Sequence, residues 1–148
     1  MHELKKSLIP QKAFDIFKRI EQSYKDQGRI SSEELLALYS YFGEPLNEAT
    51  EILEKCKITQ YSTGDFCRQI FDISISEEQY AIFENINFCH CKFFEDKVLG
   101  EKTCITCKHV LAVYLAKATG ELKKETLDHD VFQQYLNAQL GAYSNINM

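Results

Sequence analysis

Apolar residues in the first third of the chain recur at helical spacing, in three segments separated by glycine or serine. The first segment follows Pro10 and ends at Gly28, and the second begins after Ser31 or Ser32 and ends at Gly43. A third opens with a proline in its first turn. Proline at a helix start, serine as N-cap and glycine after the last turn are ordinary helix boundaries. The pattern predicts three amphipathic helices, each burying one face in a core. Their apolar stripes are Ala13, Phe14, Phe17, Ile20 and Tyr24; Leu35, Leu38, Tyr39 and Phe42; and Leu46, Ala49, Ile52, Leu53 and Cys56.

The apolar pattern changes to a period of two in the middle of the chain. Residues rich in β-branched and aromatic side chains occupy Ile58 to Tyr61, Phe66 to Ile73 and Tyr80 to Phe88. The turn-forming residues Ser62-Thr-Gly-Asp65 separate the first two runs. The pattern predicts a three-stranded antiparallel meander whose last strand leads directly into Cys89.

Two apolar segments follow and complete the predicted fold. Val110 to Ala116 is apolar on nearly every side, which favours a buried helix, and Gly120 is a C-cap candidate. A last helix is predicted from the helical spacing of Val131, Phe132, Tyr135, Leu136 and Leu140. The fold class is therefore α+β, with N-terminal helices, a small three-stranded antiparallel sheet and C-terminal helices.

The chain length fits one domain over residues 1–148. Its expected parts are a helical part (1–56), a β-meander (57–88), a cysteine-rich loop with the following helix (89–120), and a C-terminal helix and tail (121–148). No long proline-rich or glycine-rich stretch divides these parts.

The net charge and the absence of an apolar leader argue against nucleic-acid binding, membrane association and secretion. The chain has 22 acidic and 17 basic residues and a net charge of −5, a balance that is not typical of nucleic-acid-binding domains. No apolar leader follows Met1 and no stretch reaches the length of a membrane span, so no membrane association is expected. We expect a cytosolic or nuclear protein, in which clustered cysteines are more often metal ligands than disulfides.

The most specific chemistry lies in two short pairs of soft metal ligands. Cys89-His-Cys91 is followed by fifteen residues and then by Cys107-Lys-His109. Thiolate sulfur and imidazole nitrogen are the ligands of tetrahedral Zn²⁺ sites, and free N–H groups at a helix start stabilise a thiolate. The spacing predicts a closed structural zinc site made by Cys89, Cys91, Cys107 and His109.

A second ligand set remains open. Cys104 lies three residues before Cys107, so a four-cysteine site with His109 outside it also satisfies the tetrahedral rule. His90, between two ligands, is expected to point away from the metal.

The motif resembles a known family. Cys89-x-Cys91, a variable loop, Cys107-x-His109 and an alanine at Ala112 resemble the SWIM-type zinc finger. The order of helices, small sheet, finger and apolar helix further resembles the small SWIM-domain subunits of the Shu complex, an accessory of homologous recombination. The resemblance implies a non-enzymatic nuclear adaptor that pairs with a RecA-like recombinase paralogue. Such adaptors promote recombinase filament assembly on single-stranded DNA in DNA repair.

An adaptor needs a partner surface, and the apolar helix after the finger is the candidate. Its side chains cannot all face one small core, and exposed apolar patches commonly mark interfaces. The interface candidates are Val110, Leu111, Val113, Tyr114 and Leu115. The Phe14 and Phe17 stripe of the first helix is an equal alternative.

Two other functions compete with the adaptor role. The lysines Lys92, Lys97, Lys102 and Lys108, with Phe93 and Phe94, could contact single-stranded nucleic acid directly. Nearby acidic residues cancel much of this charge, which favours a solvated loop with both phenylalanines packed inward. A thiol oxidoreductase using Cys104 and Cys107 would leave the other ligands unexplained. Without a glycine-rich phosphate loop or a deaminase signature, the sequence predicts no enzyme.

Overall fold

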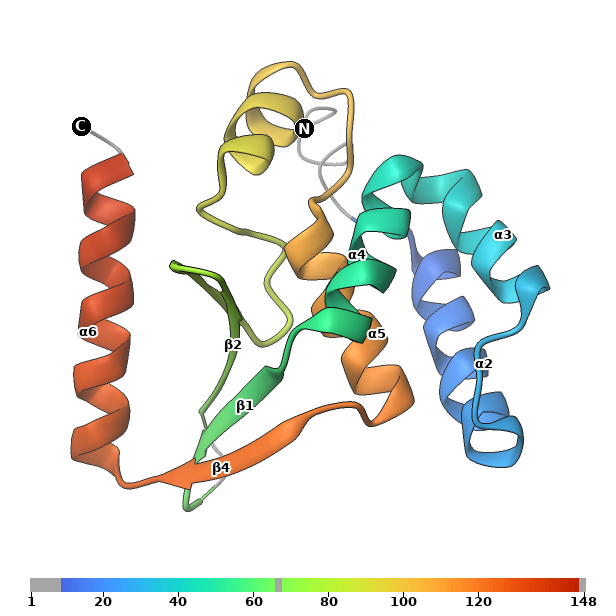
Figure 1. Ribbon diagram of the computed structural model, residues 1–148. Coiled ribbons are helices and arrows are strands. Elements are labelled where there is room, and N and C mark those ends of the chain that lie inside the picture. The colour runs from blue at the N-terminus through green and yellow to red at the C-terminus, as the bar shows by residue number, and fades with distance from the viewer. Residues whose placement is uncertain (1–8, 66–67, 147–148) are drawn as a thin grey trace.

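The computed structural model describes residues 9–65 and 68–146 (Figure 1). Three helices come first: α2 (Gln11–Gln27), α3 (Ser32–Phe42) and α4 (Glu44–Lys55). The strands β1 (Ile58–Thr63), β2 (Gln69–Ile75) and β3 (Glu78–Phe83) follow. The remaining elements are a π-helical segment η1 (Phe94–Gly100), helix α5 (Lys108–Thr119), strand β4 (Lys123–Leu127) and helix α6 (His129–Ile146).

The N-terminal helices begin and end where the local sequence predicts. Ser31 forms a capping box at the start of α3: its hydroxyl accepts a hydrogen bond from the Glu34 N–H at 3.1 Å. The Glu34 carboxylate accepts one in return from the Ser31 N–H at 3.3 Å. Gly28 ends α2 in the left-handed conformation, with φ of 69°. The α+β class with N-terminal helices is confirmed.

The sheet has four strands in the order β3-β2-β1-β4, so the predicted number of three is corrected. β1, β2 and β3 form the expected antiparallel meander, and β4 pairs in parallel with β1. β4 lies at the edge, and its sequence, Lys-Lys-Glu-Thr-Leu, has no apolar alternation because it is largely exposed. The pattern that identifies half-buried strands is therefore absent there.

The third strand ends earlier than predicted. β3 stops at Phe83, and a turn follows in which the Ile86 N–H donates to the Phe83 carbonyl at 3.2 Å. Asn85 has φ of 59°, a left-handed conformation that ends strand pairing. The chain thus leaves the sheet several residues before Cys89 and is free to bend there. The predicted start of the second strand, at Phe66, lies outside the described residues.

The sheet lies between two helical layers, with α6 on one side and helices α2 to α5 on the other (Figure 1). Successive strand residues point to opposite faces. Phe71 and Ile73 of β2 therefore face the main core, while Ile70 packs with Ala81 and with Phe132 of α6 in a smaller cluster. The inner strand β2 is therefore buried from both sides.

Helix α5 lies at the centre of the main core, in contact with α2, α4 and β3. Tyr114 stacks on Phe17 of α2 at 5.4 Å between ring centroids and meets Phe14 edge-on at 5.5 Å. The two apolar surfaces predicted as alternative interfaces therefore pack against each other.

The structure corrects the interpretation of the α5 side chains as a free surface. Tyr114 is half-buried, and the other four candidates are 0–3% exposed, covered by the chain's own helices and sheet. These four residues are Val110, Leu111, Val113 and Leu115. Burying each aliphatic side chain contributes about 1.5–3 kcal/mol to folding, so α5 is a core element.

No helix in the described part of the chain is long and apolar enough to cross a bilayer. The expectation about a leader concerns residues 1–8, which lie outside that part.

The face of the sheet that α6 covers holds the buried carboxylate of Asp72. Asp72 of β2 is 5% exposed and accepts hydrogen bonds from the Ser74 hydroxyl at 2.9 Å, the Gln79 amide and the Tyr135 hydroxyl. Tyr135 belongs to α6, so this bond ties the last helix to the sheet. Buried charges are tolerated only when they are bonded in this way.

The variant Tyr135→Phe tests this tie. Removing a hydrogen bond to a buried carboxylate should lower the free energy of unfolding by about 1.5–3 kcal/mol, measured by urea denaturation followed by circular dichroism. Tyr61→Phe is the matched control, because the Tyr61 ring contacts Tyr135 at 5.2 Å on the same face. The control should change stability by less than about 0.5 kcal/mol. Equal losses in both variants would contradict the role of the Asp72 bond.

Candidate metal centre

Four side chains from two separate segments meet at one buried point. Cys89 and Cys91 lie in the segment between β3 and η1, whereas Cys107 and His109 lie at the start of α5. Their ligand atoms all fall within 4.8 Å of one another. The side chains are 1%, 6%, 0% and 3% exposed in that order. We call these four residues the Cys3His cluster.

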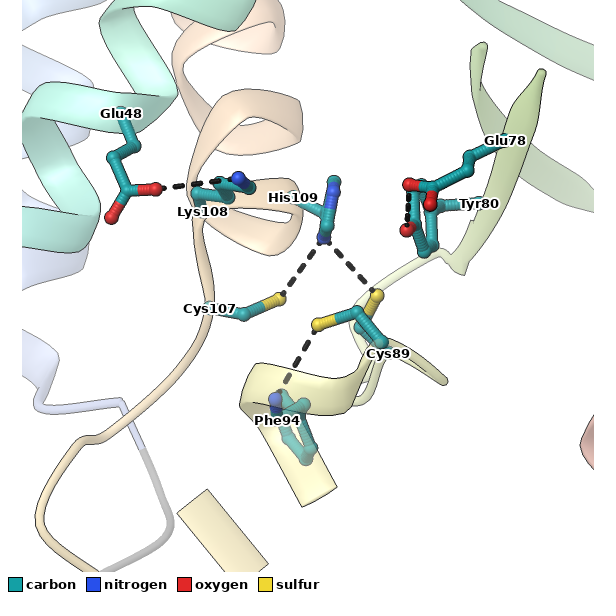
Figure 2. Close-up of polar contacts among 9 residues, drawn as sticks. Glu48, Glu78, Tyr80, Cys89, Phe94, Cys107, Lys108 and His109 are labelled. Atoms are coloured by element: carbon teal, nitrogen blue, oxygen red, sulfur yellow. Dashed lines mark hydrogen bonds and ion pairs between the residues drawn. The ribbon is translucent and has the colours of Figure 1, made fainter. Parts of the chain in front are cut away.

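The start of α5 positions two of the ligands, Cys107 and His109. Cys107 is the N-cap, in an extended conformation, and its carbonyl accepts a hydrogen bond from the Leu111 N–H at 3.2 Å. Two residues later, the His109 ring turns between the sulfur atoms of Cys107 and Cys89, as Figure 2 shows. The His109 Nδ1 atom lies 3.6 Å from the Cys89 Sγ and 3.9 Å from the Cys107 Sγ. Nδ1 is thus the nitrogen that faces the sulfurs.

A tight turn aims Cys91. Its carbonyl accepts a hydrogen bond from the Glu95 N–H at 3.2 Å, and its Sγ accepts one from the Phe94 N–H at 3.4 Å. A backbone donor on sulfur favours the thiolate form. The Phe94 ring is buried and packs edge-on against Phe88, with 5.4 Å between centroids. The turn that presents Cys91 is therefore anchored in the core.

Asn87 joins the two ligand-bearing segments directly. Its side-chain amide donates to the Ile105 carbonyl at 3.1 Å, and its amide oxygen accepts from the Thr106 hydroxyl at 2.6 Å. Asn87 lies two residues before Cys89, and Thr106 lies one residue before Cys107. One side chain thus holds both segments in register at the cluster.

The electrostatics of the three thiols favour a bound cation. Hydrogen bonding with Cys107 and Cys91, followed by burial, raises the pKa of Cys89. Burial raises the pKa of Cys107 to about 12. Hydrogen bonding with Cys107 and Cys89 lowers the pKa of Cys91. Because three adjacent buried thiolates repel one another strongly, the cluster would keep all of them ionised only around a positive ion.

The donor set fits a metal ion of the soft or borderline class. Three sulfurs and one imidazole nitrogen, buried and close together, match the ligands of tetrahedral zinc sites. The side chains that can hold such an ion are those of the Cys3His cluster.

The remaining ligand candidates lie outside the cluster. Cys104 is half-buried and does not join the four ligand atoms that come together; its backbone N–H donates to the Lys97 carbonyl at 3.1 Å. The rival four-cysteine set is therefore not assembled in this structure. His90 turns toward the sheet, where its ring lies 5.1 Å from that of Tyr80.

Two supporting residues, Asn87 and Tyr80, carry no distinct signal in the sequence. Both lie in the predicted strand Tyr80 to Phe88 and match its alternation. Tyr80 lies on β3, and its ring stacks on His109 with 3.9 Å between centroids and an interplanar angle of 25°. Contacts of this kind join residues far apart in the chain, and only the fold reveals them.

The lysines around the Cys3His cluster are largely neutralised by neighbouring carboxylates. Three ion pairs join them to carboxylates: Lys92–Asp96, Lys97–Glu101 and Lys108–Glu48, at 3.3, 2.9 and 3.3 Å. Figure 2 shows the last pair beside the cluster, where it links α5 to α4. Phe94 is buried and Phe93 packs against the core. This arrangement fits a solvated loop with inward-facing phenylalanines.

Comparison with known proteins finds relatives of one kind. The chain is 27% identical over 110 residues to zinc finger SWIM domain-containing protein 7 of Homo sapiens, covering 74% of this chain and 79% of the relative. The Danio rerio protein of that name is 25% identical over 127 residues, covering 86% and 91%. The Dictyostelium discoideum homolog is 27% identical over 126 residues, covering 84% and 80%. No family model and no solved structure matches. The resemblance to SWIM-type zinc finger proteins is confirmed.

The two hydrogen bonds that Asn87 makes to Ile105 and Thr106 give a testable prediction. Asn87→Ala leaves the Thr106 hydroxyl and the Ile105 carbonyl without this partner, so the free energy of unfolding should fall by about 1–3 kcal/mol in urea denaturation. Asn47→Ala is the control, since the Asn47 amide contacts the Glu44 carboxylate at 3.0 Å on the exposed surface. The control should lose less than about 0.5 kcal/mol. An equally small loss in Asn87→Ala would show that the Asn87 hydrogen bonds do not contribute to the stability of the fold.

Proposed function

We propose that this SWIM-type zinc finger protein is a non-enzymatic, zinc-binding nuclear adaptor. It pairs with a RecA-like recombinase paralogue and promotes recombinase filament assembly in homologous-recombination DNA repair. The observation that carries the proposal is the buried Cys3His cluster in a chain similar over most of its length to SWIM-domain relatives. The partner and the pathway come from the resemblance to the small subunits of the Shu complex.

The Cys3His cluster would hold the zinc ion. When bound, the metal supplies a cross-link between residues 89–91 and the start of α5. Structural zinc contributes apparent binding free energies of about 10–16 kcal/mol in finger peptides. Whole domains have net stabilities of only about 5–15 kcal/mol. A metal held here would therefore account for a large share of the stability of the fold.

The arrangement supports a structural rather than a catalytic metal. Catalytic zinc sites use three protein ligands and keep a fourth position for water or substrate. In this chain four side chains converge, and each is at most 6% exposed. A substrate would have no route to the ion without displacing a ligand.

Direct binding of single-stranded nucleic acid is the alternative function. It needs free cationic side chains beside exposed aromatic rings. Here the lysines Lys92, Lys97 and Lys108 face carboxylates, and Phe94 is buried. These contacts favour contact with DNA through a partner complex over direct binding by this chain.

Metal analysis of purified variants tests the ligand set. The wild-type protein and Cys104→Ser should each contain one zinc ion per chain by mass spectrometry of the metal. Cys91→Ser and His109→Ala should lose it, because each removes one of the four donors that converge in the structure. Retention of full zinc content in His109→Ala would refute the proposed ligands.

Co-purification from cells tests the adaptor role. The tagged wild-type chain and the matched Cys104→Ser variant should retain a RecA-like protein identified by mass spectrometry, whereas Cys91→Ser should lose it. The isolated chain should not bind single-stranded DNA at low salt. Failure of the wild type to retain such a partner, or DNA binding with a steep salt dependence, would favour the alternative.

A further inference from the structure

We propose that Tyr80 is a positioning residue for the metal centre. Its ring holds the His109 imidazole in the plane that aims Nδ1 at the cysteine sulfurs. Metal affinity should then depend on an aromatic ring at position 80, on a strand outside the ligand motif. This inference rests on the proposed binding of zinc at the Cys3His cluster.

The geometry places the Tyr80 ring flat against the histidine. The centroids are 3.9 Å apart and the planes differ by 25°, whereas Nδ1 lies 3.6 Å from the Cys89 Sγ. The χ2 torsion of histidine has broad minima, so the side chain alone does not fix the plane of its ring. A stacked aromatic face restricts that rotation and leaves the lone pair of the ligand nitrogen, which lies in the plane of the imidazole, free to bind a metal. The contact therefore preorganises one of the four donors.

Tyr80 is itself held by the sheet. It pairs with Ile73 of β2, and its hydroxyl donates to the Glu78 carboxylate at 2.5 Å, a bond drawn in Figure 2. Its ring also lies 5.1 Å from that of His90, the residue between Cys89 and Cys91. One side chain of β3 thus contacts both ligand-bearing segments, and the sheet serves as the fixed reference for the cluster.

The stacking should strengthen when a metal is bound. An imidazole that coordinates a cation carries part of its positive charge, and the face of a phenol ring is the negative side of its quadrupole. Residues that orient metal ligands through a second layer of contacts commonly change affinity by about 10–100-fold when mutated. A residue that merely filled space in the core would change stability and leave metal affinity unaltered.

The experiment compares three variants of the full-length chain. Zinc dissociation constants are measured by competition with a chromophoric chelator, and the stability of the metal-free protein by urea denaturation. Tyr80→Ile keeps a strand-forming residue and removes the ring, so its dissociation constant should rise about 10–100-fold. Tyr80→Phe keeps the ring and should remain within about threefold of wild type, since the stack needs only the aromatic face.

Tyr61→Leu is the matched control. Tyr61 is a half-buried tyrosine of the same sheet, and its ring packs on Tyr135 of α6, on the face opposite the cluster. It should lower stability without changing zinc affinity by more than about threefold. If Tyr80→Ile is insoluble, Tyr80→Met carries the same comparison.

Cobalt substitution gives a measurement that would stay unchanged if Tyr80 only filled space in the core. Co²⁺ probes the arrangement of sulfur and nitrogen donors through its visible bands, which should shift or weaken in Tyr80→Ile and match wild type in Tyr80→Phe. Wild-type affinity and spectrum in Tyr80→Ile would overturn the inference, as would an equal loss of affinity in Tyr61→Leu. Absence of zinc from the wild-type protein would instead overturn the proposed function.

Discussion

The convergence of two ligand pairs on one buried point constrains the rest of the molecule. One pair follows β3 and the other begins α5, so the Cys3His cluster joins elements that the backbone connects only through η1 and its flanking loops. Three buried thiols are compatible with full ionisation only around a cation. Because most side chains of α5 form the centre of the main core, fixing the start of α5 at the cluster also fixes the position of that core helix. The metal site and the hydrophobic core are therefore parts of one packing arrangement.

The two faces of the sheet depend on different interactions. On the helical face, Lys117 of α5 pairs with Glu84 at 2.7 Å just after β3, close to the path of the chain toward the cluster. On the opposite face, α6 packs through a small apolar cluster and through the hydrogen bond from Tyr135 to Asp72. A change at the metal site should therefore act first on the helical face, and α6 should respond later and less.

Local patterns predicted the elements whose signals are local. The helical stripes, the Ser31 cap and Gly28 lie within a few residues of the structure they determine, and so do the paired ligands of the cluster. The edge strand β4 gave no signal, because its lysine-rich sequence buries little on either face. The early end of β3 depends on the left-handed conformation of Asn85, which alternation does not encode.

Other features could not be predicted because they depend on tertiary contacts. An all-round apolar helix such as α5 looks the same in sequence whether its own chain or a partner covers it. Spacing also left the choice between Cys104 and His109 open, and only the fold brings the His109 Nδ1 atom to the sulfurs.

The central claim is that a metal in the Cys3His cluster holds α5 in the core. Amide hydrogen exchange of the zinc-loaded protein, compared with protein whose zinc removal by a chelator has been verified, tests it most directly. The account predicts a large loss of protection in α5 and in residues 84–93, with a smaller change in α6. Unchanged protection of α5 after verified zinc removal would contradict it.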